Sequence, residues 1–246
     1  MVLATRHAGK ERLGSLRRIG MEAVRVPRVK ICCIASVDKA RLAISCGASA
    51  LGLVSAMPSG PGPISEERIA EIAATIPPPI GSFLLTSLRD VESIIAQQRR
   101  CRTNTIQLCD SLVRGSHQEL KAALPGISIV QVIHVAGPES IDEALACAPY
   151  VDALLLDSGN PKLAVKELGG TGRVHDWALS RQIREQAGVP VFLAGGLTAE
   201  NVARAVEGVG AFGADLCSGV RTNGRLDSAK LEAFFSAVYG TGKSLP

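Results

Sequence analysis

The sequence has no uncharged apolar run of the roughly 18 to 20 residues that a membrane-spanning helix needs. It also has no apolar segment of about 7 to 15 residues near its basic N-terminus, as a secretory signal would have. Its seven cysteines include no C-x-x-C pair, which argues against a structural zinc site, and an odd, scattered set is unlike a disulfide framework. We therefore expect a soluble protein of the reducing cytoplasm, without a metal and without membrane association.

Surplus charge is confined to the first 28 residues. This segment holds seven Lys/Arg and two acidic residues, whereas residues 29–246 hold 20 and 21. Such a leader could be a transit peptide, a nucleic-acid-binding arm, or sequence ahead of a later start at Met21. We expect residues 1–28 to form a disordered N-terminal extension without a targeting function. We expect no nucleic-acid partner because the remainder of the chain is nearly neutral.

After the leader, short apolar runs alternate with amphipathic segments, the pattern of βαβ units that form a parallel sheet. In residues 65–76, for example, the apolar residues fall on one helical face behind Ser65, a typical N-cap. Four more helices are expected at 90–100, 138–148, 198–209 and 227–238. The eight predicted strands are 29–34, 48–54, 79–86, 104–109, 127–135, 152–157, 190–195 and 211–217.

Eight strand and helix units in one chain predict a single (β/α)₈ TIM barrel over residues 29–240. The alternation never changes to paired hairpin strands, so no second domain is needed. A doubly wound open sheet is the structural alternative.

In a TIM barrel the active site lies at the carboxyl ends of the strands. Glycine is concentrated there in the last third of the chain, and glycine lets backbone N–H groups approach an anion closely. Each segment alone could simply form a tight turn, but three together predict a phosphate site. The residues concerned are Gly170, Thr171, Gly172, Gly195, Gly196, Ser218 and Gly219.

Two titratable side chains also follow strands at this end of the barrel, Cys32 and Asp157. A thiol and a carboxyl group can act as a base and an acid if their surroundings favour the required protonation states. Lys30, two residues before Cys32, could supply the positive charge that favours a thiolate. Taken singly, Cys32 is better explained as core filler, and Asp157 as a helix N-cap or a loop anchor.

Six segments together resemble phosphoribosylanthranilate isomerases of tryptophan biosynthesis. They occur in the family's order and span residues 29 to 239. They are VKICCI, TIQLC, LLLDS, GGTGRVHDW, LAGGLTAENV, and ADLCSGV followed by LDSAKLEAFF.

The resemblance implies an Amadori rearrangement of an N-linked phosphoribosyl amine, with no cofactor. Cys32 matches the general base and Asp157 the general acid of the family. Asp215 matches a carboxylate at the end of strand eight that contacts the sugar or orients the catalytic groups. The implied partner is a small phosphosugar, and the protein could be a monomer or a homodimer.

The sequence departs from the family where the anthranilate carboxylate would bind. Gly62 stands in place of an arginine, and Cys109 and Asp110 replace a His-Gly pair, so that Asp110 would repel an anionic aglycone. Arg221, after the Ser-Gly-Val segment, could restore positive charge to the substrate site. Cys33 replaces a glycine, and strand alternation predicts that its side chain points away from the site.

These differences leave two alternatives to phosphoribosylanthranilate isomerase. One is an isomerase or lyase acting on another phosphosugar amine. The other is a barrel without catalytic activity that binds phosphorylated metabolites.

Overall fold

Eight parallel strands close into a barrel in the computed structural model, which describes residues 26–241. Each strand pairs with the next one along the chain, and β8 pairs with β1 through the register Lys30 to Asp215. Every strand predicted from the sequence is present. The strands are β1 (Arg28–Ile31), β2 (Ala50–Val54), β3 (Gly81–Thr86), β4 (Thr105–Leu108), β5 (Ser128–His134), β6 (Ala153–Asp157), β7 (Val191–Leu193) and β8 (Gly213–Leu216).

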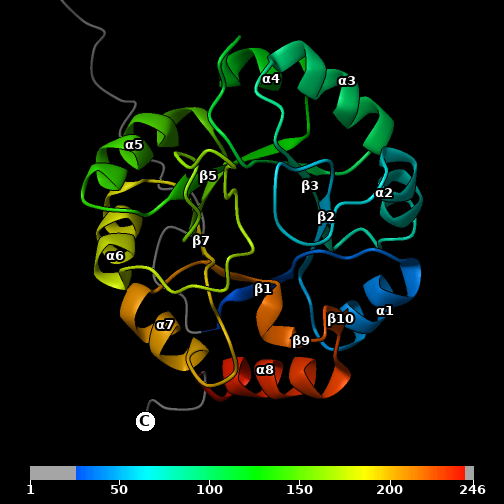
Figure 1. Cartoon of the computed structure of the whole chain (residues 1–246), viewed down its shortest axis with the longest axis vertical. Coiled ribbons are helices and arrows are strands. Elements are labelled where there is room, and N and C mark those ends of the chain that lie inside the picture. Colours follow the sequence, from blue (N-terminus) through cyan, green and yellow to red (C-terminus); the bar gives the residue numbers. More distant parts are fainter. Residues whose placement is uncertain (1–25, 242–246) are drawn as a thin grey trace, which may run out of the picture.

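A ring of helices surrounds the strands, as Figure 1 shows in a view along the barrel. The five helices expected from the sequence are present, and three more complete the ring. The helices are α1 (Val37–Ser45), α2 (Glu66–Ala73), α3 (Val91–Cys101), α4 (His117–Ala123), α5 (Glu139–Cys147), α6 (Trp177–Gln186), α7 (Val202–Val209) and α8 (Ser228–Thr241). The predicted extension, residues 1–28, lies almost entirely outside the described residues. Between residues 26 and 241, no helix combines the length and apolarity needed to cross a bilayer.

Short polar side chains fix where several helices begin. Ser36, Ser65, Asp90 and Ser116 each accept a hydrogen bond from the backbone N–H three residues further on. An N-cap of this kind satisfies one of the N–H groups that the first turn of a helix leaves without a partner. The caps therefore end the loops after β1, β2, β3 and β4 at a defined residue.

The barrel has two apolar layers, one between the strands and the helices and one inside the barrel. In the inner layer, Phe83 and Phe192 meet edge to face with their ring centroids 5.9 Å apart. Because large rings fill the interior, the barrel is a packed core, and the pocket described below opens at its rim.

One hairpin interrupts the βα alternation, contrary to the sequence prediction. Strands β9 (Arg221–Thr222) and β10 (Arg225–Leu226) pair antiparallel after β8. The turn between them has positive φ at Asn223 (51°) and Gly224 (74°), the conformation that an Asn-Gly pair favours in a two-residue hairpin. The hairpin positions Arg221 beside the candidate site.

Candidate active site

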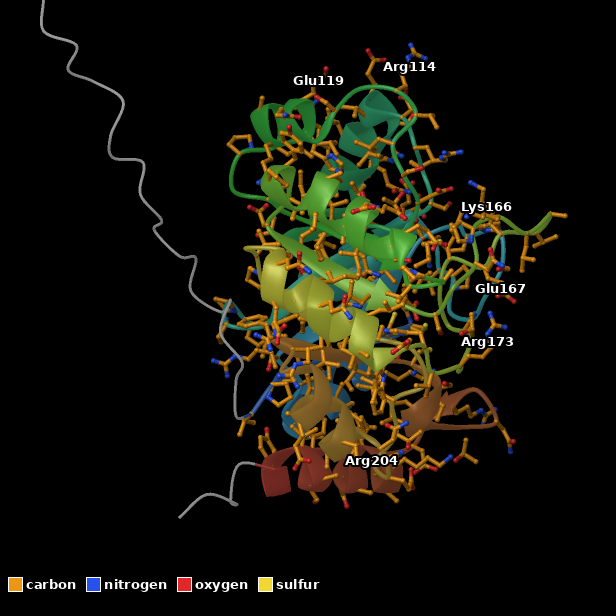
Figure 2. All side chains as sticks on the ribbon, turned by 90° about the vertical axis from the view of Figure 1, so that its left-hand side faces the viewer. Arg114, Glu119, Lys166, Glu167, Arg173 and Arg204 are labelled. Carbon is orange, nitrogen blue, oxygen red and sulfur yellow. The ribbon has the colours of Figure 1, made fainter. Side chains whose placement is uncertain are left out.

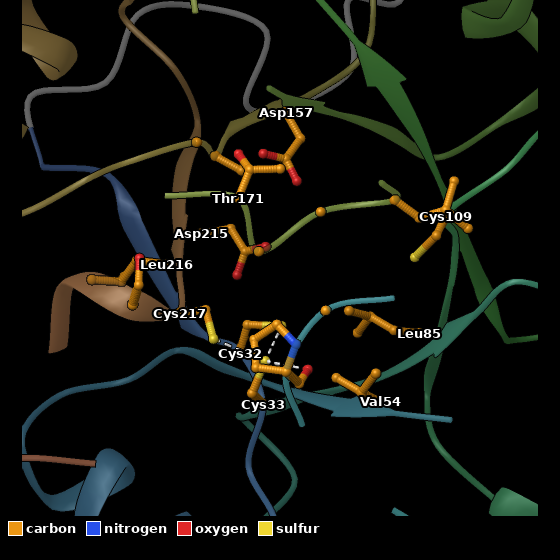
Figure 3. Close-up of a pocket in the computed structure, with 18 of the residues that line it drawn as sticks. Cys32, Cys33, Val54, Leu85, Cys109, Asp157, Thr171, Asp215, Leu216 and Cys217 are labelled. Atoms are coloured by element: carbon orange, nitrogen blue, oxygen red, sulfur yellow. Dashed lines mark hydrogen bonds between the residues drawn. The ribbon is translucent and has the colours of Figure 1, made fainter. Parts of the chain in front are cut away.

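A pocket with an empty volume of about 670 Å³ opens at the carboxyl ends of the strands. Cys32, directly after β1, and Asp157, the last residue of β6, both line it, and each side chain is largely buried. Figure 3 shows Asp157, Thr171 and Asp215 on one side of this space and Cys32 on the other. The barrel therefore brings together the thiol and the carboxyl group that the sequence singled out.

The Cys32 thiol lies over Gly52 of β2. A Cβ at residue 52 would lie 3.0 Å from Cys32 Sγ and 3.1 Å from Lys30 Nζ, so the glycine leaves the room that both side chains occupy. Cys109, after β4, is a second thiol in the pocket lining, and burial raises its pKa so that it stays protonated. Cys32 is thus the thiol that shares its space with an ammonium group.

The Asp157 carboxyl group is held in one orientation. Its Oδ1 accepts a hydrogen bond of 2.7 Å from the backbone N–H of Ser158, and its Oδ2 would lie only 2.8 Å from a Cβ at Gly169. Burial raises the pKa of Asp157, against the lowering effect of the Ser158 N–H and of His134. A carboxyl group of this kind can hold a proton and deliver it into the pocket.

Lys30 and Asp215 form a buried ion pair below the pocket. Lys30 Nζ lies 2.9 Å from Asp215 Oδ1, and the lysine side chain has no exposed surface. Burial by itself would lower the pKa of Lys30, but the charge of Asp215, the contact with its carboxylate and the nearby Cys32 and Cys109 together outweigh burial and raise that pKa. Asp215 lines the pocket, whereas Lys30 lies beneath it with its ammonium 5.3 Å from the centre of the Phe83 ring.

The three glycine segments meet at one corner of the pocket. A Cβ at Gly172 would lie 3.5 Å from Ser218 Oγ, and a Cβ at Gly196 would lie 2.8 Å from the Gly172 carbonyl oxygen. A Cβ at Gly195 would lie 3.1 Å from Ser158 Oγ. The predicted phosphate residues Gly170, Thr171, Gly172, Gly195, Gly196 and Ser218 all line the pocket.

Gly219 contributes to this corner through packing. A Cβ there would lie 2.0 Å from the Leu197 carbonyl oxygen, so no other residue fits without a backbone shift. This contact joins the loop after β7 to the short helix η2 (Ser218–Val220) that follows β8.

The side chain of Cys33 points toward the pocket, contrary to the expectation from strand alternation. Strand β1 ends at Ile31, and Cys33 has a left-handed backbone with φ 60°, so the alternation of a strand no longer applies. Its Sγ lies 3.7 Å from Cys32 Sγ and 2.9 Å from Cys217 Sγ. Cys33 and Cys217 both line the pocket.

The Arg221 guanidinium binds the backbone beside the pocket. It donates hydrogen bonds to the carbonyl oxygens of Cys32 (2.6 Å), Cys33 (2.9 Å) and Cys217. These contacts tie the end of β1 to the segment that follows β8.

A charged cluster that the sequence did not reveal lies next to the pocket. Asp110 forms ion pairs with Lys166, from the loop after β6, and with Arg89, whose Nε is 3.4 Å from Asp110 Oδ2. These residues line a neighbouring hollow that shares Met57 and Leu168 with the main pocket. Figure 2 shows Lys166 among the loops that project from one side of the barrel. The charge of Asp110, expected to repel an anionic aglycone, is therefore matched by two cations.

Comparison with known proteins agrees with this geometry. Residues 29–237 match the family model for N-(5'-phosphoribosyl)anthranilate (PRA) isomerase. The chain is 36% identical over 209 residues to N-(5'-phosphoribosyl)anthranilate isomerase 2 of Methanosarcina mazei, covering 84% of this chain and 92% of that protein. It is 35% identical over 216 residues to the isomerase of Halobacterium salinarum, covering 87% and 96%.

Solved structures give the same result. Phosphoribosyl anthranilate isomerase from Thermotoga maritima superimposes with a TM-score of 0.71 at 27% identity, covering 87% of this chain and 99% of that one. An isomerase in complex with reduced 1-(o-carboxyphenylamino)-1-deoxyribulose 5-phosphate superimposes with a TM-score of 0.69 at 25% identity and the same coverage. The chain therefore belongs to the N-(5'-phosphoribosyl)anthranilate isomerase family, whose members are isomerases of tryptophan biosynthesis.

Proposed function

We propose that this pocket converts N-(5'-phosphoribosyl)anthranilate into 1-(o-carboxyphenylamino)-1-deoxyribulose 5-phosphate, with Cys32 and Asp157 as the reacting groups. The observation that carries this proposal is that a thiol and a carboxyl group from different strands line one pocket, beside a glycine-rich corner. The alternative substrates, other phosphosugar amines, lack the aromatic carboxylate for which the pocket's neighbouring cations are suited.

The first step is opening of the sugar ring. Asp157 gives its proton to the ring oxygen, the bond from that oxygen to C1 breaks, and the nitrogen lone pair forms a protonated Schiff base at C1. Burial favours this role because it keeps Asp157 protonated above the ordinary range for an aspartate.

The second step is removal of the proton from C2 by the Cys32 thiolate. The electrons of the C–H bond move toward the iminium nitrogen and give an enol, which becomes the ketone as C1 takes up a proton and the C2 hydroxyl loses one. The Lys30 ammonium beside Gly52 supplies a positive charge close to the thiol, and the substrate's own nitrogen serves as the electron sink. This chemistry calls for no cofactor.

Asp215 contacts the sugar hydroxyls in this proposal, and Lys30 acts through it. The Lys30 ammonium has no exposed surface and lies 2.9 Å from the Asp215 carboxylate. Lys30 therefore orients that carboxylate and does not contact the ligand itself. Arg221 likewise acts on the site by holding the backbone of Cys32 and Cys217.

The substrate phosphate binds at the glycine corner. Backbone N–H groups can approach an anion closely there because the glycines have no side chains, and the Ser158 and Thr171 hydroxyls, 2.7 Å apart, lie beside it. Ser218 completes the corner from the end of β8.

Lys166 and Arg89 are the groups we assign to the aromatic carboxylate. They line the hollow next to the catalytic pocket, and among the described residues both form their ion pair with the same carboxylate, Asp110, so these three groups together keep one positive charge. A charge-assisted hydrogen bond contributes about 1.5 to 3 kcal/mol, so Lys166→Ala should lower kcat/KM by roughly 10- to 150-fold, mostly through KM. Lys162→Ala, an exposed lysine of the same loop, is the matched control.

Assembly and location follow the family in this proposal. The isomerase of Thermotoga maritima is described as dimeric, and we propose a monomer or homodimer of the cytoplasm that has no nucleic-acid partner.

Complementation of a tryptophan auxotroph that lacks this isomerase tests the function. The wild-type chain should restore growth, Cys32→Ala should not, and Cys46→Ala should behave as wild type. With purified protein, Asp157→Asn should lose at least about 100-fold in kcat, whereas the exposed Asp142→Asn should not. A folded wild-type protein that neither rescues growth nor turns over the substrate would refute the proposal.

A further inference from the structure

Three thiols gather on one side of the pocket rim, and only Cys32 has a role in the proposed reaction. Cys33 Sγ lies 2.9 Å from Cys217 Sγ, although the two residues are 184 positions apart in the chain. Figure 3 shows the two side chains next to each other. A disulfide bond is about 2.05 Å long, so the two sulfur atoms need to move less than about 1 Å to bond. Both thiols are partly exposed and line the pocket, where a small oxidant can reach them.

The surrounding backbone holds the two cysteines in this arrangement. Arg221 bridges the carbonyl oxygens of Cys33 and Cys217, which keeps the end of β1 beside the segment after β8. Gly62 provides the space for the Cys33 side chain, since a Cβ at residue 62 would lie 2.6 Å from Cys33 Cβ. The left-handed backbone of Cys33 is thus fixed from both sides.

The charges around the pair favour a thiolate on one partner. The hydrogen bond with Cys33 lowers the pKa of the Cys217 thiol, burial opposes this effect, and the positive charge of Arg221 adds to it. The same hydrogen bond raises the pKa of Cys33. Cys217 is therefore the nucleophile of the pair, because thiol–disulfide exchange proceeds through the thiolate.

We propose that Cys33 and Cys217 form a reversible disulfide that lowers the activity of the pocket under oxidising conditions. With a small disulfide such as oxidised glutathione, the Cys217 thiolate attacks one sulfur and releases one glutathione thiolate. Cys33 then loses its proton to water and displaces the second glutathione. The two cysteines lose two electrons in total, and the glutathione disulfide gains them as it becomes two thiols.

The effect on activity rests on the proposed function. Cys33 Sγ lies 3.7 Å from Cys32 Sγ, so a disulfide with Cys217 removes the S–H group next to the catalytic thiol. It also ties Cys33 to the loop that holds Ser218 at the phosphate corner. Oxidation should therefore lower isomerase activity by more than half, and dithiothreitol should restore it.

The test uses the full chain, equilibrated in glutathione buffers from fully reduced to fully oxidised. We expect two of the seven thiols to disappear together, and peptide mapping should show a crosslink between the segment with Cys33 and the segment with Cys217. Cys32→Ser should still form the crosslink, which separates Cys33 from its neighbour. Cys33→Ser and Cys217→Ser should each abolish it, whereas Cys46→Ser should not.

Three results would overturn the proposal. The first is a thiol count that stays at seven in fully oxidised glutathione, and the second is a crosslink that persists in Cys33→Ser. The third is a crosslinked wild-type enzyme as active as the reduced one, which would show that the disulfide does not regulate activity. If the proposed isomerase function were wrong, the crosslink would still form, but the reduced enzyme would be inactive on the phosphoribosyl substrate.

Discussion

The side chain of Cys33 occupies the volume that a side chain at Gly62 would fill. A Cβ built at Gly62 would lie 2.6 Å from Cys33 Cβ and 3.0 Å from Cys33 Sγ. From the sequence, both positions are identified as departures from the family that the chain resembles, with a cysteine in place of a glycine and a glycine in place of an arginine. In the structure the Cys33 side chain fills the space at the pocket rim that a side chain at residue 62 would occupy, so the two departures compensate each other in volume.

This relationship predicts that restoring the arginine alone is harmful. Gly62→Arg should lower the free energy of unfolding by about 2 kcal/mol or more, because the new side chain meets Cys33 and because residue 62 has φ 91°. Urea denaturation of the purified variant measures the change.

The double variant Cys33→Gly/Gly62→Arg separates the two causes. Removing the Cys33 side chain relieves the steric conflict but not the backbone strain, so the two changes should couple favourably by at least about 0.5 kcal/mol. Additive effects would show that residues 33 and 62 do not compete for space.

The sequence predicted the barrel well because strands and helices repeat with a strong apolar pattern. It also located Cys32, Asp157 and the glycine corner, since the ends of parallel strands meet at one face of a barrel. The orientation of Cys33 was not predictable, because a left-handed residue directly after a strand has no periodic signal. The ion pairs of Asp110 were missed because Lys166 lies 56 residues away in a loop.

Close packing at Gly219 predicts a second effect on stability. Gly219→Ala should destabilise the protein by about 1 to 3 kcal/mol and weaken phosphate binding, because the added methyl group would lie 2.0 Å from the Leu197 carbonyl oxygen. Gly208→Ala is the matched control, since Gly208 lies in α7 with nothing within 4 Å of the added atom. It should stabilise the protein by about 0.5 to 1 kcal/mol. Equal effects of the two substitutions in thermal unfolding would contradict this account.

The protonation of Asp157 predicts opposite effects on stability and activity. Its pKa is raised in the folded protein, so its contribution to stability is present below the ordinary aspartate pKa and lost as the pH rises through the folded value. Asp157→Asn should therefore be more stable than the wild type at pH 8, although it has lost its activity. The asparagine Oδ1 can still accept the Ser158 hydrogen bond.

Unfolding curves at pH 8 and at low pH test this prediction. The advantage of Asp157→Asn should shrink as the pH falls toward 4. A variant less stable than the wild type at pH 8 would mean that the carboxylate is stabilised by its surroundings, and it would remove the basis for its role as an acid.

His175 predicts a loss of stability in acid. Its Nε2 lies 2.7 Å from Ser180 Oγ in a largely buried position, and burial lowers its pKa from 6.5 to about 4. Between these two pH values the unfolded chain binds a proton that the folded protein does not, so stability falls as the pH falls from about 6.5 to about 4. The full effect is at most roughly 3 kcal/mol.

In His175→Gln, which can keep a hydrogen bond to Ser180 but cannot titrate, this part of the pH dependence should disappear. The free energy of unfolding of both proteins, measured at steps from pH 8 to pH 4, gives curves that should diverge below about pH 6.5. Parallel curves over that range would show that the imidazole can take up a proton in the folded state, and that the loop after β6 opens to water more readily than its packing against Gly195 indicates.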